Sequence, residues 1–167
     1  GVKNFFSNLG DLSVIANEIL QLKFDEAASD VSRVLVNSTI GLLGFFDISS
    51  EIGLPKHNED FGQTLALWGF EPGPYIVVPF FGPATFRDLS SLVIDKGILN
   101  PMFYIEDDMT KAGLLTLNYV DFKSRFSSTN DLIGVAALDE YEFIKNAYFE
   151  KRAYEINDGN VIDFIEE

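Results

Sequence analysis

The only imidazole of the chain, His57, lies in the polar run Lys56–Asp60, close to two carboxylates. An imidazole beside carboxylates has the donor groups of a metal site or of a general base. A zinc site commonly uses more than one histidine or cysteine, and the chain has one histidine and no cysteine. We therefore interpret His57 as a solvent-facing histidine in a loop before a helix, and we expect neither a metal nor a cofactor.

Two other groups of charged residues have the residue types of a binding site. Glu106, Asp107 and Asp108 are consecutive, but they lack the alternating ligand spacing of a calcium-binding loop. A solvated acidic turn before a helix is the better interpretation. Arg87 and Asp88 are adjacent in a predicted helix. This pair is equally compatible with a polar site facing a cavity and with an ordinary surface ion pair.

The sequence contains no signature of a catalytic centre. It has no Gly-x-Ser-x-Gly nucleophile turn and no glycine-rich phosphate loop that ends in Gly-Lys-Ser or Gly-Lys-Thr. We predict that the protein is not an enzyme and has no catalytic residues.

Composition limits the possible partners. The 167 residues fit one domain with a buried core. The net charge of −14 excludes nucleic acid, whose phosphates require a basic surface, and also the basic face of many membrane-surface helices. Hydrophobic residues make up 47% of the chain, including 16 Phe. Contact with lipid would therefore be apolar, although no apolar run approaches the ~18–20 residues that span a bilayer.

Apolar spacing and helix-breaking residues predict one mostly helical domain without internal repeats. The predicted helices are Val2–Leu9, Leu12–Leu22, one that opens at Asp25, Phe61–Trp68 capped by Asp60, one from Pro83 to about Asp95, Thr110–Phe126, and one from Asp131 to about Ile156. Gly10 is expected to separate the first two. Pro79 interrupts the one β-like run, residues 75–81, so we expect no central strand. Residues 47–60 form a polar connection.

Apolar stripes are expected on two of these helices. On the helix that opens at Asp25, one stripe consists of Ala28, Val31, Val34 and Leu35, with Asp30 and Arg33 off it. On the last helix, the stripe that seats it on the rest consists of Ala137, Tyr141, Ile144 and Tyr148.

Adjacent aromatic rings suggest an apolar interaction surface. The three pairs are Phe5-Phe6, Phe45-Phe46 and Phe80-Phe81. Neighbouring residues of a helix point about 100° apart, so one ring of a pair is free to contact lipid or protein. Any single pair is better explained as part of a wide core stripe. Three pairs together with Trp68 and Tyr75 favour an interaction surface.

The order of short motifs along the chain resembles the MlaA/VacJ family over nearly the whole length. The motifs are Asn4–Leu9, Arg33, Asn37–Gly41, Gly44–Asp47, Leu54-Pro55, Glu59–Leu65, Trp68-Gly69, Gly73–Tyr75, Pro79–Pro83, Arg87-Asp88, Tyr141, Tyr148 and Arg152. The densest block, from Glu59 to Asp88, is the most specific part of this resemblance.

The resemblance implies a lipoprotein of the bacterial outer membrane, anchored in the inner leaflet and facing the periplasm. It implies an all-α, single-domain fold, a ring of amphipathic helices that lies in one leaflet with Pro- and Gly-rich bends. Through a channel in such a ring, misplaced phospholipid would leave the outer leaflet. The implied partners are phospholipid, trimeric porins of the OmpC/OmpF kind and the periplasmic carrier MlaC. We assign this domain to residues 1–167, with the signal, the lipidated cysteine and the first helices missing from this chain.

Within this picture, two sets of residues are expected to form the functional surfaces. The residues that we hypothesise to line the lipid path or bind headgroups are Gln63, Thr64, Arg87 and Asp88. Those that we hypothesise to contact the membrane or a partner are Phe45, Phe46, Trp68, Tyr75, Phe80 and Phe81. The alternative function is a porin-associated scaffold lipoprotein without a lipid conduit, and a lipid hydrolase that depends on His57 is a less favoured third.

Overall fold

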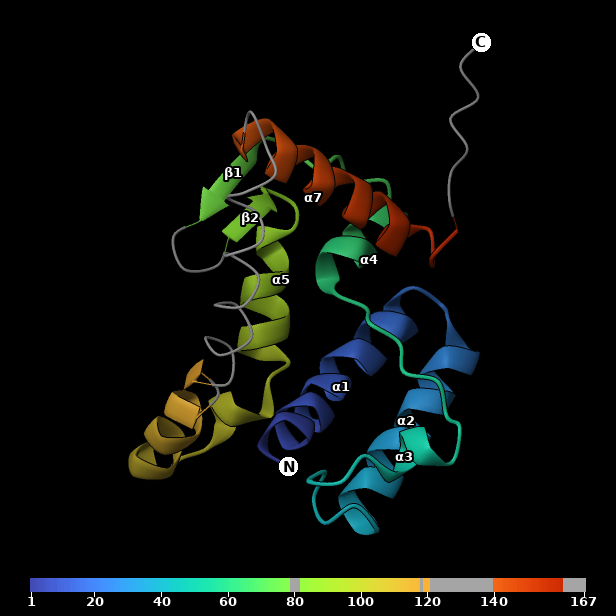
Figure 1. Ribbon diagram of the computed structural model, residues 1–167, viewed down its shortest axis with the longest axis vertical. Helices are drawn as coiled ribbons and strands as arrows, with labels where there is room; N and C mark the ends of the chain where they lie inside the picture. Colours follow the sequence, from blue (N-terminus) through green and yellow to red (C-terminus); the bar gives the residue numbers. More distant parts are fainter. Residues whose placement is uncertain (79–81, 118, 121–139, 161–167) are drawn as a thin grey trace.

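The computed structural model describes residues 1–78, 82–117, 119–120 and 140–160, which are mostly helical (Figure 1). The helical elements are α1 (Val2–Leu20), α2 (Phe24–Thr39), α3 (Ile48–Glu51), α4 (Phe61–Leu67), α5 (Leu89–Val93), the π turn η1 (Ile94–Ile98), the 3-10 turn η2 (Pro101–Tyr104) and α7 (Glu140–Ile156). A further helix occupies residues 108–117. Within the described residues, none of the helices has the length and apolar character that crossing a membrane requires.

The elements follow one another around a ring in Figure 1. The α1–α2 hairpin with α3 forms one side, α4 and α7 close one end, and the β-hairpin with α5 forms the other side. The expected helical, ring-like fold is therefore confirmed, with a small sheet as an addition.

The sheet has two antiparallel strands, β1 (Tyr75–Val78) and β2 (Gly82–Thr85). Pro83 lies opposite Val77 in this hairpin and does not open a helix, so the predicted helix from Pro83 is wrong. Helix α5 begins six residues later. A two-stranded sheet consists of edge strands, which tolerate a residue without an N–H. Pro79, Phe80 and Phe81 lie outside the described residues.

Gly10 does not interrupt the first helix, which continues through it to Leu20. Glycine inside a helix costs roughly 1 kcal/mol relative to alanine, which the packing of α1 against α2 offsets. Asp11 therefore lies within α1 and not at the start of a second helix. Its side chain is buried in the middle of α1 and pairs with Lys56.

Helix α2 buries its polar side. Its buried residues are Ala27, Asp30, Arg33 and Asn37. The predicted apolar stripe points the other way: Ala28, Val31 and Leu35 are exposed and Val34 is half-buried. The stripe itself was predicted correctly, but it does not face the interior of the chain.

Across the described residues, as in α2, polar side chains tend to be buried and large apolar side chains tend to be exposed. Only four of the described apolar residues are buried: Phe6, Val14, Ala27 and Met102. The buried polar residues are Asn8, Asp11, Asn17, Glu18, Asp30, Arg33, Asn37, Ser49, Glu59, Gln63, Thr64, Thr85, Asp88 and Arg152. Exposed large apolar residues occur on nearly every element, among them Leu22, Phe24, Leu35, Ile40, Leu43, Phe70, Phe86, Val93 and Met109.

Other expectations are confirmed at the ends of elements. The Asp60 carboxylate accepts a hydrogen bond from Gln63 N at 2.9 Å and caps α4. The exposed Asp107 does the same for Thr110 N at 2.7 Å, as expected of a solvated acidic turn. Helix α7 ends at Ile156, whereas the predicted cap Asp131 and stripe residue Ala137 lie outside the described residues.

Candidate functional site

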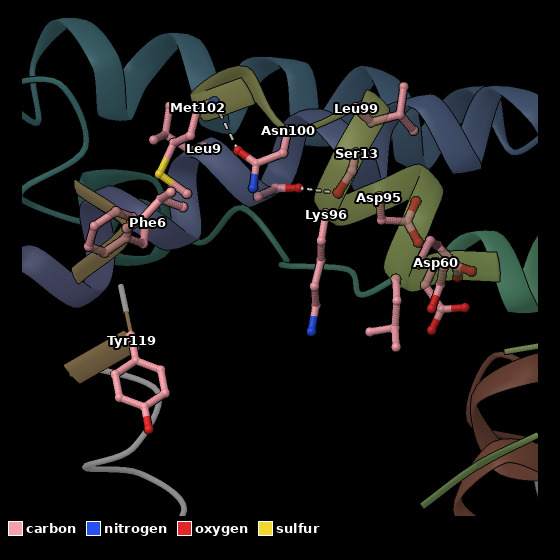
Figure 2. A pocket seen from close by; sticks show the side chains of 15 residues that line it. Phe6, Leu9, Ser13, Asp60, Asp95, Lys96, Leu99, Asn100, Met102 and Tyr119 are labelled. Atoms are coloured by element: carbon pink, nitrogen blue, oxygen red, sulfur yellow. Dashed lines mark hydrogen bonds between the residues drawn. The ribbon is translucent and has the colours of Figure 1, made fainter. Parts of the chain in front are cut away.

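A cavity of about 620 Å³ lies between α1, the start of α4, the α5–η1 run and the segment that follows it (Figure 2). The side chains around it come from segments far apart in the sequence. They are Phe6, Leu9, Gly10, Ser13, Glu59, Asp60, Ser91, Leu92, Asp95, Lys96, Leu99, Asn100, Met102, Leu115 and Tyr119.

The two ends of this cavity differ in chemistry. Phe6, Leu9 and Met102 gather at one end, with Tyr119 below them, whereas Asp60 and Asp95 lie at the other (Figure 2). Between the two ends the Lys96 side chain extends away from η1. The cavity is therefore amphipathic, with a cationic group beside acidic ones at its polar end.

The polar end is held in place by hydrogen bonds across the fold. Asp95 accepts from Asn17 Nδ2 at 2.8 Å and from Phe61 N at 2.9 Å, so it joins η1 to α1 and α4. Burial raises the pKa of Asp95 above its usual range. Burial also lowers the pKa of Lys96, against the opposing influence of Asp95 and Asp60. The five-residue π turn places the neighbouring Asp95 and Lys96 on this side, and such turns often occur at functional sites.

Behind the polar end, one guanidinium joins two carboxylates. Arg152 Nη1 and Nη2 donate to Asp60 at 2.7 and 3.0 Å, and its Nη2 and Nε donate to Asp88 at 2.9 and 3.2 Å. The Tyr148 hydroxyl donates to Asp88 and accepts from Thr85 N at 3.0 Å. We call Asp60, Asp88, Tyr148 and Arg152 the Arg152 clasp, because it fastens α7 to α4 and to the end of β2.

The charges of the clasp stabilise one another. Burial alone would raise the pKa of Asp88, but the Tyr148 hydrogen bond and the Arg152 charge lower it below 3.8. Burial and the hydrogen bond to Asp88 raise the pKa of Tyr148 to about 12. Burial opposes the charge on Arg152, yet Asp60 and Asp88 raise its pKa further. The clasp is thus part of a larger ionic network, in which Arg87 also pairs with Asp88 and Glu155 with Arg152.

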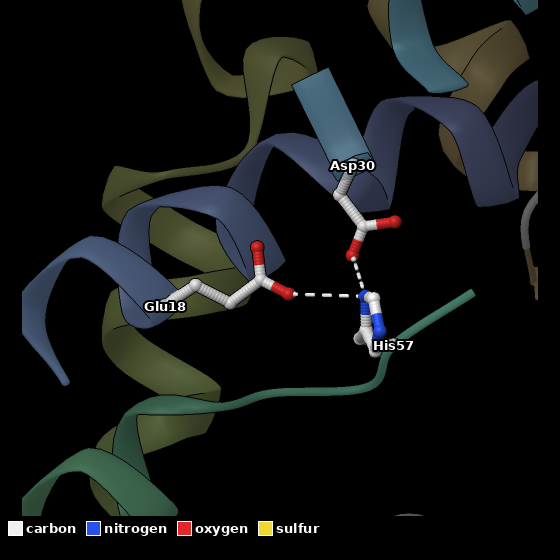
Figure 3. A group of neighbouring side chains, drawn as sticks. All are labelled: Glu18, Asp30 and His57. Atoms are coloured by element: carbon white, nitrogen blue, oxygen red, sulfur yellow. Dashed lines mark hydrogen bonds and ion pairs between the residues drawn. The ribbon is translucent and has the colours of Figure 1, made fainter. Parts of the chain in front are cut away.

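A second buried cluster contains Glu18 of α1, Asp30 of α2 and the loop residue His57 (Figure 3). His57 Nδ1 lies 3.0 Å from Asp30 Oδ2 and 3.5 Å from Glu18 Oε1. The His57 side chain is 25% exposed and those of Glu18 and Asp30 are 0% and 1% exposed. The prediction of a solvent-facing histidine is therefore wrong: the ring nitrogen faces two buried carboxylates. Burial, and then Asp30, raise the pKa of Glu18 to about 8.

None of the predicted headgroup residues lines the cavity. Thr64 is fully buried, and its hydroxyl donates to Asn17 Oδ1 at 2.8 Å. Gln63 is also buried and donates to the backbone oxygen of Asn58 at 3.0 Å. Arg87 and Asp88 form a buried pair at 3.1 Å, so the interpretation as a surface pair is wrong. Their contact with headgroups stays a prediction.

The predicted contact residues are placed differently from one another. Phe45, Phe46 and Trp68 are 42%, 56% and 51% exposed. Tyr75 is half-buried, and its ring centroid lies 5.7 Å from that of Tyr148. Phe80 and Phe81 lie outside the described residues. A role of these side chains in membrane or partner contact likewise stays a prediction.

Sequence reasoning missed the cavity lining and the buried polar cluster. One signal was available for the cluster: Asp30, Arg33 and Asn37 recur at spacings of three and four, which places polar groups on one helix face. Asp95 and Lys96 have no such signal, because the cavity depends on how η1 packs against α1.

Comparison with known proteins gives consistent matches. The model of the MlaA lipoprotein family matches residues 1–155. An uncharacterized protein of Rickettsia felis is 33% identical over 151 residues, which are 90% of this chain and 60% of that protein. The "intermembrane phospholipid transport system lipoprotein MlaA" of Escherichia coli is 27% identical over 165 residues, which are 96% of this chain and 64% of that protein. This chain thus spans about 60% of the length of these curated relatives.

A solved structure described as the structural basis for maintenance of bacterial outer membrane lipid asymmetry has the same fold. It aligns with a TM-score of 0.75 at 24% identity, over 94% of this chain and 79% of that chain.

Proposed function

The chain belongs to the MlaA lipoprotein family, and from this membership we propose that it carries phospholipid out of the outer leaflet of the bacterial outer membrane. In this proposal it lies in the inner leaflet, held by a lipid anchor, and passes phospholipid to a periplasmic carrier such as MlaC. The relatives from Escherichia coli and Haemophilus influenzae are named as intermembrane phospholipid transport lipoproteins, which supports the assignment.

The observation that carries the proposal is the inverted placement of polar and apolar side chains. Buried polar residues outnumber buried apolar ones among the described residues, and large apolar side chains are exposed on nearly every element. A lipid environment requires that polar groups be satisfied internally and allows apolar groups to face outward. Helices of this kind can lie in one leaflet without spanning the bilayer.

The cavity supports the choice of ligand. Its volume of about 620 Å³ falls within the range of roughly 300–1,000 Å³ typical of small-molecule sites. The apolar side chains of Phe6, Leu9 and Met102 suit acyl chains, and the ammonium group of Lys96 suits a phosphate. Asp60 and Asp95 suit the cationic part of a zwitterionic headgroup.

The scaffold alternative uses the same apolar exterior but has no need of the cavity. In both cases the exposed Phe45, Phe46 and Trp68 offer a contact surface for the membrane or for a trimeric porin. Blocking the cavity should abolish lipid transport but leave a scaffold function intact, so this treatment distinguishes the lipid conduit from the scaffold.

The absence of cysteine from this chain makes that experiment direct. Ser13→Cys places a thiol in the cavity, and Asn146→Cys places one on the exposed face of α7 as the matched control. Each variant is expressed in a Gram-negative strain without its own MlaA, labelled with a bulky maleimide, and assayed for outer-leaflet phospholipid and for bound porin.

We expect the labelled Ser13→Cys protein to lose most of its ability to restore lipid asymmetry, while porin binding and the Asn146→Cys control stay normal. Full asymmetry with a completely labelled Ser13→Cys protein would contradict the proposed conduit and favour the scaffold.

A further inference from the structure

We infer that Glu18, Asp30 and His57 form a binding site for a divalent transition-metal ion of the zinc class, which ties the loop before α4 to the α1–α2 hairpin. None of the three residues lines the cavity, so the inference does not depend on the proposed lipid path. It also reverses the expectation of no metal, which was based on the single histidine of the sequence.

The geometry of the three donor groups supports a shared ion. His57 Nδ1 lies 3.0 Å from Asp30 Oδ2 and 3.5 Å from Glu18 Oε1, and all three ligand atoms lie within 4.8 Å of one another. Ligands held at about 2.1 Å from one zinc ion are separated by roughly 3.0–3.4 Å. The 3.0 Å distance falls in this range and the 3.5 Å distance lies just above it, so a bound ion would draw Glu18 slightly closer to the imidazole and to Asp30.

The hydrogen bonding of the carboxylates points to a missing cation. Glu18 is fully buried, and neither of its carboxylate oxygens has a hydrogen-bond partner among the described residues. Asp30 Oδ1 also has no hydrogen-bond partner among the described residues, and Arg33 Nε lies 3.6 Å from it. Buried carboxylates without partners are strongly unfavourable, and without a cation Glu18 avoids that cost by holding a proton, as its raised pKa shows. A bound metal would displace that proton. A divalent ion between them and the imidazole would satisfy oxygens from both residues.

An imidazolium without a metal satisfies the site less well. His57 directs a single ring nitrogen at the two carboxylates (Figure 3). One N–H at this position serves either Asp30 or Glu18 fully, and it leaves Glu18 Oε2 without a partner.

The chemical types of the three ligand atoms indicate which class of metal ion the site would bind. One imidazole nitrogen and two carboxylate oxygens suit zinc and neighbouring transition metals, whereas calcium takes six to eight oxygen ligands. The partial exposure of His57 leaves room for water as a fourth ligand. Because the ligands come from α1, α2 and the loop before α4, a bound ion would join these three segments.

The first test measures metal content. The untagged protein in detergent is stripped with EDTA, incubated with excess Zn²⁺, desalted and analysed for bound zinc. We expect about one zinc per chain in the wild type and in the control Asn58→Ala, whose side chain is exposed in the same loop. His57→Asn should retain less than about a tenth of that amount. Equal zinc in wild type and His57→Asn would overturn the inference.

The second test uses only the wild type, so it does not depend on the folding of a variant. Because His57 is the only histidine, selective ¹⁵N-histidine labelling of the untagged chain yields one imidazole in the NMR spectrum. Added Zn²⁺ should move the Nδ1 resonance to a metal-bound position that is insensitive to mild acidification. An Nδ1 resonance that excess Zn²⁺ leaves unchanged would overturn the inference as well.

Discussion

The Arg152 clasp and the cluster of Glu18, Asp30 and His57 both connect segments far apart in the sequence, but their charges are balanced differently. In the clasp every carboxylate oxygen of Asp60 and Asp88 accepts at least one hydrogen bond. In the other cluster neither oxygen of Glu18 has a hydrogen-bond partner among the described residues.

This difference shows which buried carboxylates receive enough hydrogen-bond donors from the described part of the chain and which do not. A guanidinium offers five N–H donors in a fixed fork and can serve two carboxylates at once. An imidazole that directs one nitrogen at two carboxylates cannot. The clasp is therefore complete as folded, whereas the cluster becomes complete with an added cation.

The largest effect is expected from breaking the clasp itself. Arg152→Met leaves the half-buried Asp60 without its cation and the buried Asp88 with Arg87 alone, and losing one partner of a buried ion pair costs about 3–5 kcal/mol. Chemical unfolding in detergent should show this loss. The control Lys151→Met removes a pair whose lysine is 73% exposed, and its effect should stay below about 1 kcal/mol. Similar losses in both variants would show that the clasp does not hold α7.

Removing metal should have the next largest effect, and only on the cluster of Glu18, Asp30 and His57. An ion present at a hundredfold excess over its dissociation constant stabilises the folded state by about 2.7 kcal/mol. EDTA should therefore lower the unfolding midpoint of the wild type but leave that of His57→Asn unchanged. If EDTA lowers the unfolding midpoints of the wild type and of His57→Asn equally, the cluster of Glu18, Asp30 and His57 does not bind the metal.

A smaller effect is expected from crowding the clasp. A Cβ on Gly62 would lie 2.5 Å from Asp88 Oδ1 and 2.8 Å from Arg152 Nη2. Gly62→Ala should destabilise the protein by about 1–3 kcal/mol. Gly10→Ala is the matched control, since nothing lies within 4 Å of its Cβ, and it should stabilise α1 by about 0.5–1 kcal/mol. Thermal unfolding of the two variants should move in opposite directions.

Acid should produce the smallest effect, and it should act on the clasp. The pKa of Asp88 in the folded protein lies below the ordinary value of 3.8, so the folded state binds fewer protons there than the unfolded state. The stabilisation by Asp88 is complete above that ordinary pKa and is lost as the pH falls through the lower, folded value. The stability of the wild type should decline more steeply below pH 3.8 than that of Asp88→Asn. If the stability of the two proteins declines equally steeply as the pH falls, the pairing of Asp88 with Arg152 is contradicted.

The sequence predicted those features that depend on neighbouring residues. Asp60 as the cap of α4 and the end of α7 at Ile156 follow from local hydrogen bonding and periodicity. The spacing of Val31, Val34 and Leu35 also located a stripe correctly. Periodicity does not say which face of a helix points inward, however, and in α2 the polar face does.

Features built from distant segments were not predictable in this way. His57 looked solvent-facing because its partners Glu18 and Asp30 precede it by dozens of residues, on two different helices. The polar end of the cavity likewise depends on the hydrogen bond between Asn17 and Asp95, which are 78 residues apart. The assignment of residues 1–167 to one domain stays a prediction.

The π turn η1 has a consequence for how the lining of the cavity is set. A π turn is a stretch of helix with one residue more than the regular winding requires, so it acts as a one-residue insertion into the run that begins with α5. A deletion in the regular turns of α5 would rotate the side chains that follow it by about 100° around the axis. Deleting the extra residue of Ile94–Ile98 would instead restore regular winding with little change in where the chain leaves the helix towards Leu99, Asn100 and Met102. At this turn the chain can therefore lose a residue while the lining of the cavity that follows keeps its direction.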